Sequence, residues 1–236
     1  MPTNMRRAAL ILTLTIAAKV SQGQTTNYFG LFPTIDHSGD LSKKFGYNAY
    51  LFDAIKLQGS DDAAVPADGS SFYIYGELGL SYQLTPRLSA TAAYVHERQH
   101  PFTDSYRTEN RLFQQLTLKL PIGKSELKQR LRFDERFVQD RATGNAPLTT
   151  RLRYLIGLKY PTNTKAYFTG YTEAFFNTSN DFTYEENWAA LQGGLKLNAA
   201  NAIEAGLLLV NWKLSEGWLN QYYLQLTWVS HIDFRK

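Results

Sequence analysis

Hydrophobic and polar residues alternate along most of this chain once its first two dozen residues are passed. The clearest stretch spans residues 127–137. In an extended strand, successive side chains point to opposite faces, so this stretch predicts a strand with one ionic and one apolar face. The ionic face carries Lys128, Arg130, Arg132, Asp134 and Arg136, and the apolar face carries Leu127, Leu131, Phe133 and Phe137.

The same alternation recurs and predicts about eleven strands, each longer than the usual strand of a soluble sheet. Short turns rich in Pro, Gly or Asn alternate with longer polar loops between them, which is typical of outer-membrane barrels. The predicted strands cover residues 26–37, 45–57, 71–84, 88–96, 109–120, 126–139, 150–160, 165–177, 186–197, 202–213 and 220–234.

Two fold classes fit this pattern, a soluble β-sandwich and an outer-membrane β-barrel. Strand length and the alternation of turns and loops favour the barrel. We therefore predict an all-β fold, a single antiparallel transmembrane β-barrel of about ten to twelve strands with short periplasmic turns and longer outer loops. Because closed bacterial barrels have even numbers, ten or twelve strands are expected. Leucine and aromatic faces should meet lipid, and charged faces should line the interior.

The N-terminus has the pattern of a secretory signal peptide covering residues 1–23. Arg6 and Arg7 precede a short apolar run, and cleavage is expected before Gln24. This leaves residues 24–236 for the barrel and predicts location in the cell outer membrane. Removal of the leader takes away three of the cations behind the formal charge of +4, so the charge is no argument for nucleic acid. The chain contains no cysteine, which excludes disulfides and thiolate metal sites.

Four short runs resemble a family of bacterial outer-membrane β-barrels, frequent in Bacteroidota, known only as domain of unknown function 2490. They are ENRLFQQ at 109–115, KQRLRFDER at 128–136, TRLRY at 150–154 and TEAFFN at 172–177. The resemblance implies location in the outer membrane and a β-barrel fold, but no activity. It also implies outer-membrane lipid and the barrel-assembly machinery as partners. Trp188 departs from the family pattern, which often has Arg there, and the chain ends on Phe234-Arg235-Lys236 rather than on an aromatic residue.

Charged side chains concentrate on the predicted interior face, and two interpretations are open. Clustered Arg and Lys side chains can attract and bind anions. The same residues can instead brace a narrow barrel through ion pairs across its interior. The candidates for interior-facing residues are Glu77, Glu109, Arg111, Lys128, Arg130, Arg132, Asp134, Arg136, Arg151, Arg153 and Glu173.

No other constellation predicts chemistry. The histidines lack the spacing of a metal site, no Gly-x-Ser-x-Gly motif occurs, and three strand serines have no obvious partner. We therefore expect surface or loop histidines, no catalytic, cofactor or metal site, and a protein that is not an enzyme. These residues are His37, His96, His100 and His231, and Ser81, Ser89 and Ser230.

Three functions fit these observations. The first is a narrow porin-like channel or binding barrel for small anionic or polar solutes. The second is a structural or interaction barrel of the cell envelope with a plugged interior. The third is a barrel lipid hydrolase.

Overall fold

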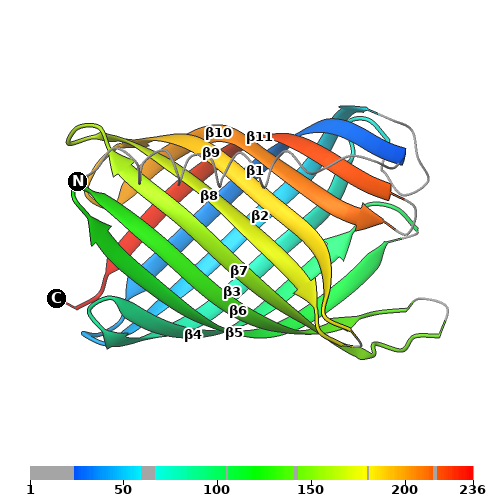
Figure 1. Cartoon of the computed structure of the whole chain (residues 1–236), viewed down its shortest axis with the longest axis horizontal. Coiled ribbons are helices and arrows are strands. Elements are labelled where there is room, and N and C mark those ends of the chain that lie inside the picture. Colours follow the sequence, from blue (N-terminus) through cyan, green and yellow to red (C-terminus); the bar gives the residue numbers. More distant parts are fainter. Residues whose placement is uncertain are drawn as a thin grey trace.

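The computed structural model describes residues 24–59, 67–104, 106–140, 143–179, 181–214 and 217–235. The predicted signal peptide lies outside these residues. Within them the chain forms eleven strands that close into one barrel (Figure 1). The strands are β1 (Gln24–Asp40), β2 (Phe45–Gly59), β3 (Ser71–Thr85), β4 (Leu88–Gln99), β5 (Arg107–Ile122), β6 (Ser125–Val138), β7 (Leu148–Pro161), β8 (Ala166–Asn177), β9 (Thr183–Lys196), β10 (Asn201–Leu214) and β11 (Gly217–Asp233).

Sequence neighbours pair antiparallel around the barrel, whereas β1 and β11 pair in parallel to close it. This parallel ladder runs from Gln24 opposite Gly217 to Asp40 opposite Asp233. The prediction of a closed, mainly antiparallel barrel in the range of ten to twelve strands is confirmed. The expectation of an even number is wrong, because the first and last strands run in the same direction and an odd number of alternating strands closes only through one parallel pair.

Short turns and longer loops lie at opposite ends of the barrel, which are the left and right ends in Figure 1. The turns follow β1, β3, β5, β7 and β9, and their residue chemistry explains why they are tight. Gly123 adopts a φ of 61°, which a glycine takes without steric penalty. The Asn163 side chain accepts hydrogen bonds from the backbone amides of Lys165 and Ala166. The predicted alternation of turns and loops is therefore confirmed for the connections after β1 to β9, whereas only two residues separate β10 from β11 at the loop end.

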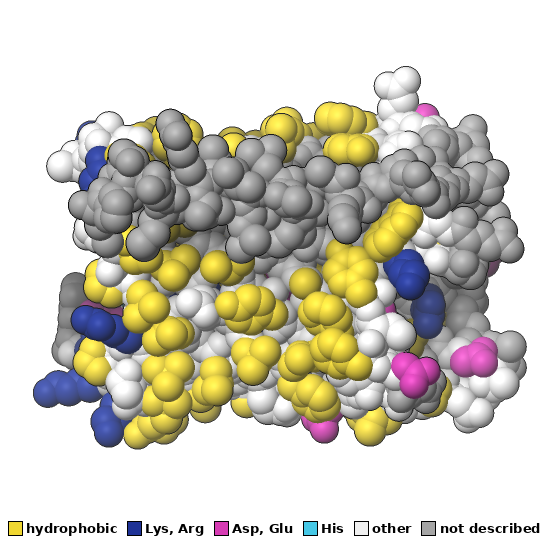
Figure 2. Space-filling model, viewed as in Figure 1, with side chains coloured by type: hydrophobic (Ala, Val, Ile, Leu, Met, Phe, Trp, Pro, Cys, Tyr) yellow, Lys and Arg dark blue, Asp and Glu magenta, His cyan; other side chains and the backbone are white. Residues whose placement is uncertain are grey.

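Apolar side chains cover the outer face of the barrel between its two ends (Figure 2). Leu131 and Phe133 are 46% and 37% exposed there, as their place in the alternation predicts. On β11, the predicted apolar face from Tyr222 to Ile232 also points outward and is exposed. Within the described residues, no helix is long and apolar enough to cross a membrane.

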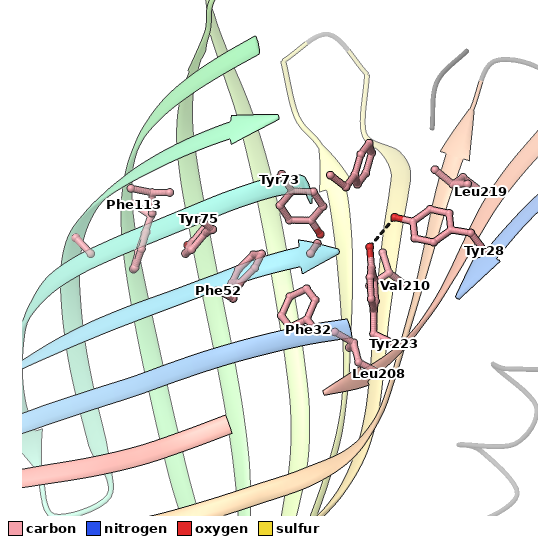
Figure 3. Packing of buried hydrophobic residues seen from close by; sticks show 14 residues of the cluster. Tyr28, Phe32, Phe52, Tyr73, Tyr75, Phe113, Leu208, Val210, Leu219 and Tyr223 are labelled. Carbon is pink, nitrogen blue, oxygen red and sulfur yellow. Dashed lines mark hydrogen bonds between the residues drawn. The ribbon is translucent and has the colours of Figure 1, made fainter. Parts of the chain in front are cut away.

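Aromatic side chains also pack inside the barrel, in addition to the outward-facing ones that the sequence predicts (Figure 3). Tyr28 and Tyr223 join β1 to β11 through their hydroxyl groups, 2.5 Å apart. Phe32 and Phe52 stack with ring centroids 4.4 Å apart, and Phe52 stacks on Tyr75 at 4.7 Å. These rings fill the side of the interior formed by β1, β2, β3 and β11, and we call them the aromatic cluster.

Candidate functional site in the barrel interior

All eleven predicted interior residues occupy the inward-facing positions of their strands. Ten of them line a cavity of about 760 Å³ inside the barrel. Asp134 is the exception, because its side chain is fully buried among its neighbours. The ten lining residues are Glu77, Glu109, Arg111, Lys128, Arg130, Arg132, Arg136, Arg151, Arg153 and Glu173.

An ion pair between Arg132 and Glu77 crosses the interior. Arg132 lies on β6 and Glu77 on β3, two strands that are separated by β4 and β5 in the wall. The Arg132 Nη1 atom lies 3.2 Å from Glu77 Oε2, and both residues are buried. The guanidinium also lies 3.6 Å from the centre of the Phe113 ring, a cation–π contact. These contacts hold the two side chains across the barrel instead of leaving them free in water.

Glu173 on β8 binds two arginines. Arg153 donates from Nε and Nη2 to its two carboxylate oxygens at 2.9 and 3.0 Å. Arg130 donates from Nη2 to the same oxygens at 2.8 Å each. One carboxylate therefore compensates two cations, which leaves this part of the wall with an excess of positive charge.

A second ion-pair group lies nearer the loops. Glu109 accepts hydrogen bonds from Arg111 at 2.6 Å and from Arg136 at 2.7 Å. Asp134 pairs with Arg151 at 3.2 Å, while its Oδ1 atom is buried without a hydrogen-bond partner. Buried charges in a folded protein are normally paired in this way, because an isolated charge would be costly.

Charge is nearly balanced over the cavity lining as a whole. Ten Arg or Lys side chains and nine Asp or Glu side chains contribute to it. Six of these acids are not among the candidates predicted from the sequence, namely Asp36, Glu97, Glu126, Glu185, Glu186 and Glu204. The alternation of inward and outward positions along their strands is the sequence signal that could have identified most of them. Most of the Arg side chains in this lining are in ion pairs, so the bracing interpretation accounts for the middle and loop side of the barrel.

Aromatic rings also span the interior. Trp188 on β9 reaches Phe32 on β1 and Phe52 on β2, with ring centroids 5.8 and 6.0 Å apart. Trp212 on β10 similarly lies 6.4 Å from Phe72 on β3. Trp188 therefore joins the aromatic cluster to β9. Together with the Arg132–Glu77 pair, it narrows the middle of the cavity.

The interior is more open near the short turns. Asp36, Lys119 and Lys159 face inward and are exposed, and Glu126 and Lys128 are half-buried. We call these five residues the turn-end vestibule. Their exposure contrasts with the burial of Glu77, Arg132 and Glu173 further along the same interior. Water can therefore enter the cavity from the turn end.

The parallel pair of β1 and β11 brings together a serine and a histidine that are far apart in the sequence. His37 Nδ1 lies 2.6 Å from Ser230 Oγ, and its Nε2 lies 2.7 Å from the Tyr47 hydroxyl. The expectation that Ser230 has no partner is wrong, and so is that of a surface or loop position for the half-buried His37. The sequence carried no signal for this contact, because it depends on a parallel ladder. Among the described residues, no group of acids and histidines could hold a metal ion.

Comparison with known proteins identifies one family. A family described as "Protein of unknown function (DUF2490)" matches residues 29–222, which covers most of the barrel. No curated protein and no solved structure matches the chain. The family resemblance predicted from the four short runs is confirmed, while the link to Bacteroidota stays a prediction.

Proposed function

The chain belongs to this family of proteins of unknown function, DUF2490, and we propose that it is an outer-membrane β-barrel that binds a small anionic or polar solute in a cavity entered from the turn end. The exposed apolar side chains on the outer wall support insertion in a membrane, because a contiguous apolar surface of this kind is rare on a soluble monomer. If the short turns face the periplasm, as in other outer-membrane barrels, the vestibule opens to the periplasm.

The narrowing of the interior by side chains that cross it is the observation that carries this proposal. A wide porin holds an open aqueous channel, whereas here the Arg132–Glu77 pair joins β6 to β3 and Trp188 on β9 contacts Phe32 on β1. A cavity of about 760 Å³ remains. That volume lies in the range of about 300–1,000 Å³ typical of small-molecule sites. A binding barrel therefore fits the interior better than a porin-like channel does.

Two measurements on the wild-type protein test the proposal. We expect the protein in the outer-membrane fraction, with gel migration that changes on boiling as for a folded barrel. In planar bilayers we expect no stepwise, porin-like conductance. Recovery as a soluble periplasmic protein would contradict the location, and steady open-channel conductance would contradict a binding barrel.

A structural role in the cell envelope is the second candidate. The near balance of charge and the dense ion pairs favour it, because they stabilise the barrel without any solute. The two functions differ in one measurable property. A structural barrel would bind no small anion in its interior, whereas a binding barrel would.

A further inference from the structure

Lys119 and Lys128 form a pair of like charges inside the barrel. They are direct partners in the antiparallel ladder between β5 and β6, and both line the cavity. Directly opposite residues have their Cβ atoms only about 4.5–5.5 Å apart, and like charges in this arrangement are destabilising. A negatively charged group close to both lysines would reduce the repulsion between them.

The protein supplies little of that charge. Within the described part of the chain, neither lysine forms an ion pair with a carboxylate. The charges of both lysines act on Asp36, which remains exposed to the cavity. Glu173 also acts on Lys128, but it is already bound by Arg130 and Arg153. The turn-end vestibule therefore holds two acids, Asp36 and Glu126, against three lysines.

Arg130 adds a third cation on the same wall. It lies two residues from Lys128 on the inward face of β6 and shares Glu173 with Arg153. Its Nε atom is buried and has no hydrogen-bond partner. An N–H group in this state is costly unless a ligand or water accepts its hydrogen bond.

The cavity itself supplies the space for a ligand beside these cations, because Lys119, Lys128 and Arg130 all line it. Lys128 faces Gly157 on β7, so no side chain from that position reaches the lysine. Tyr171 packs against Gly157 and also lines the cavity, so a phenol ring lies next to this space. The cavity is open to water through the turn-end vestibule.

From these observations we propose that Lys119, Lys128 and Arg130 form a binding site for a phosphate group carried by a small solute. Two ammonium groups supply point charges and the guanidinium supplies directed N–H donors, a combination suited to a dianionic oxyanion. The entry of solute from the turn end is taken from the proposed function, on which this proposal rests. The site itself requires only that the barrel is folded.

Titration calorimetry on the folded, detergent-purified barrel tests the site, with inorganic phosphate and glycerol 3-phosphate as separate probes and acetate as a monovalent reference. We expect both phosphates to bind and acetate to bind more weakly. The Lys119→Met/Lys128→Met variant should bind phosphate about tenfold or more weakly, because two charge-assisted contacts are lost. Lys128→Arg, which keeps the charge, should retain most of the affinity.

Lys124→Met is the matched control, because Lys124 lies in the turn between β5 and β6 and packs on the Tyr160 ring outside the cavity. It should bind phosphate like the wild type. Gel migration with and without boiling establishes that each variant is folded. Failure of the folded wild type to bind either phosphate overturns the site, as does unchanged affinity in the double variant. Phosphate binding by a protein that conducts ions, or that is absent from the outer membrane, contradicts the proposed function but leaves this site standing.

Discussion

His37 on β1 and Ser230 on β11 lie directly opposite each other in the parallel ladder, with Nδ1 2.6 Å from Oγ. The imidazole also contacts the Tyr47 hydroxyl on β2, so one side chain links three consecutive strands of the wall. Gly39 makes room for this arrangement, because a Cβ atom there would meet the Tyr47 ring. The contact therefore helps to hold β1 against β11, the strand pair that closes the barrel.

Removal of this contact should weaken the closed barrel. We expect His37→Ala and Ser230→Ala each to lower the free energy of unfolding by about 1 kcal/mol, the usual contribution of a hydrogen bond. The double variant should lose less than the sum, because both substitutions remove the same contact. Urea unfolding in detergent, followed by tryptophan fluorescence, measures all three values. His96→Ala, an exposed histidine on the outer wall, is the control. Strictly additive losses would contradict the coupling of His37 and Ser230.

The Arg132–Glu77 pair should respond asymmetrically to substitution. Arg132→Ala leaves the Glu77 carboxylate buried without its cation, and we expect a loss of about 3–5 kcal/mol in the free energy of unfolding. The double variant Arg132→Met/Glu77→Gln removes both charges and should be more stable than Arg132→Ala. The same urea unfolding experiment provides the comparison. If the double variant were less stable than Arg132→Ala, the two buried charges would not be compensating each other as argued.

Truncation of Trp188 should widen the interior. Trp188→Ala removes the ring that reaches Phe32 and Phe52, so we expect ion conductance in planar bilayers, whereas we expect none for the wild type. Trp228→Ala, on the outer wall, is the matched control and should remain closed. A closed Trp188→Ala barrel would show that the ion pairs alone block the path.

Most of the fold could be predicted from the alternation of polar and apolar side chains along the chain. In each strand of a barrel wall, successive side chains point in turn to the interior and to the outer face. That rule placed Glu77, Arg132 and Glu173 inside and Leu131 outside without any tertiary information. It could not predict the closure, since the partner of the first strand is set by the geometry of the whole barrel rather than by local residues. It also could not tell that inward-facing aromatic rings such as Phe52 would fill the interior, because alternation defines a face but not its partners.

Stability should depend on pH through His100, which lies in the loop after β4 against the Phe72 ring. Burial lowers the pKa of His100 below its ordinary value of 6.5. The folded protein therefore favours the neutral imidazole. The resulting gain in the free energy of unfolding is present above pH 6.5, and it is lost as the pH falls below that value and His100 becomes protonated. Urea unfolding between pH 5 and pH 8 should show this decrease, and His100→Asn should reduce it. An identical pH profile in the variant would exclude His100 as its source.

The parallel ladder between β1 and β11 also sets an order of assembly. All other neighbouring strands are successive hairpins, whereas His37 and Ser230 are 193 residues apart in the chain. Bringing such distant segments together carries the largest loop-closure entropy of any strand pair in the barrel. The chain is therefore expected to grow as a curved, open sheet from β1 to β11 and to gain its enclosed interior, with the proposed anion site, only when these two outermost strands meet.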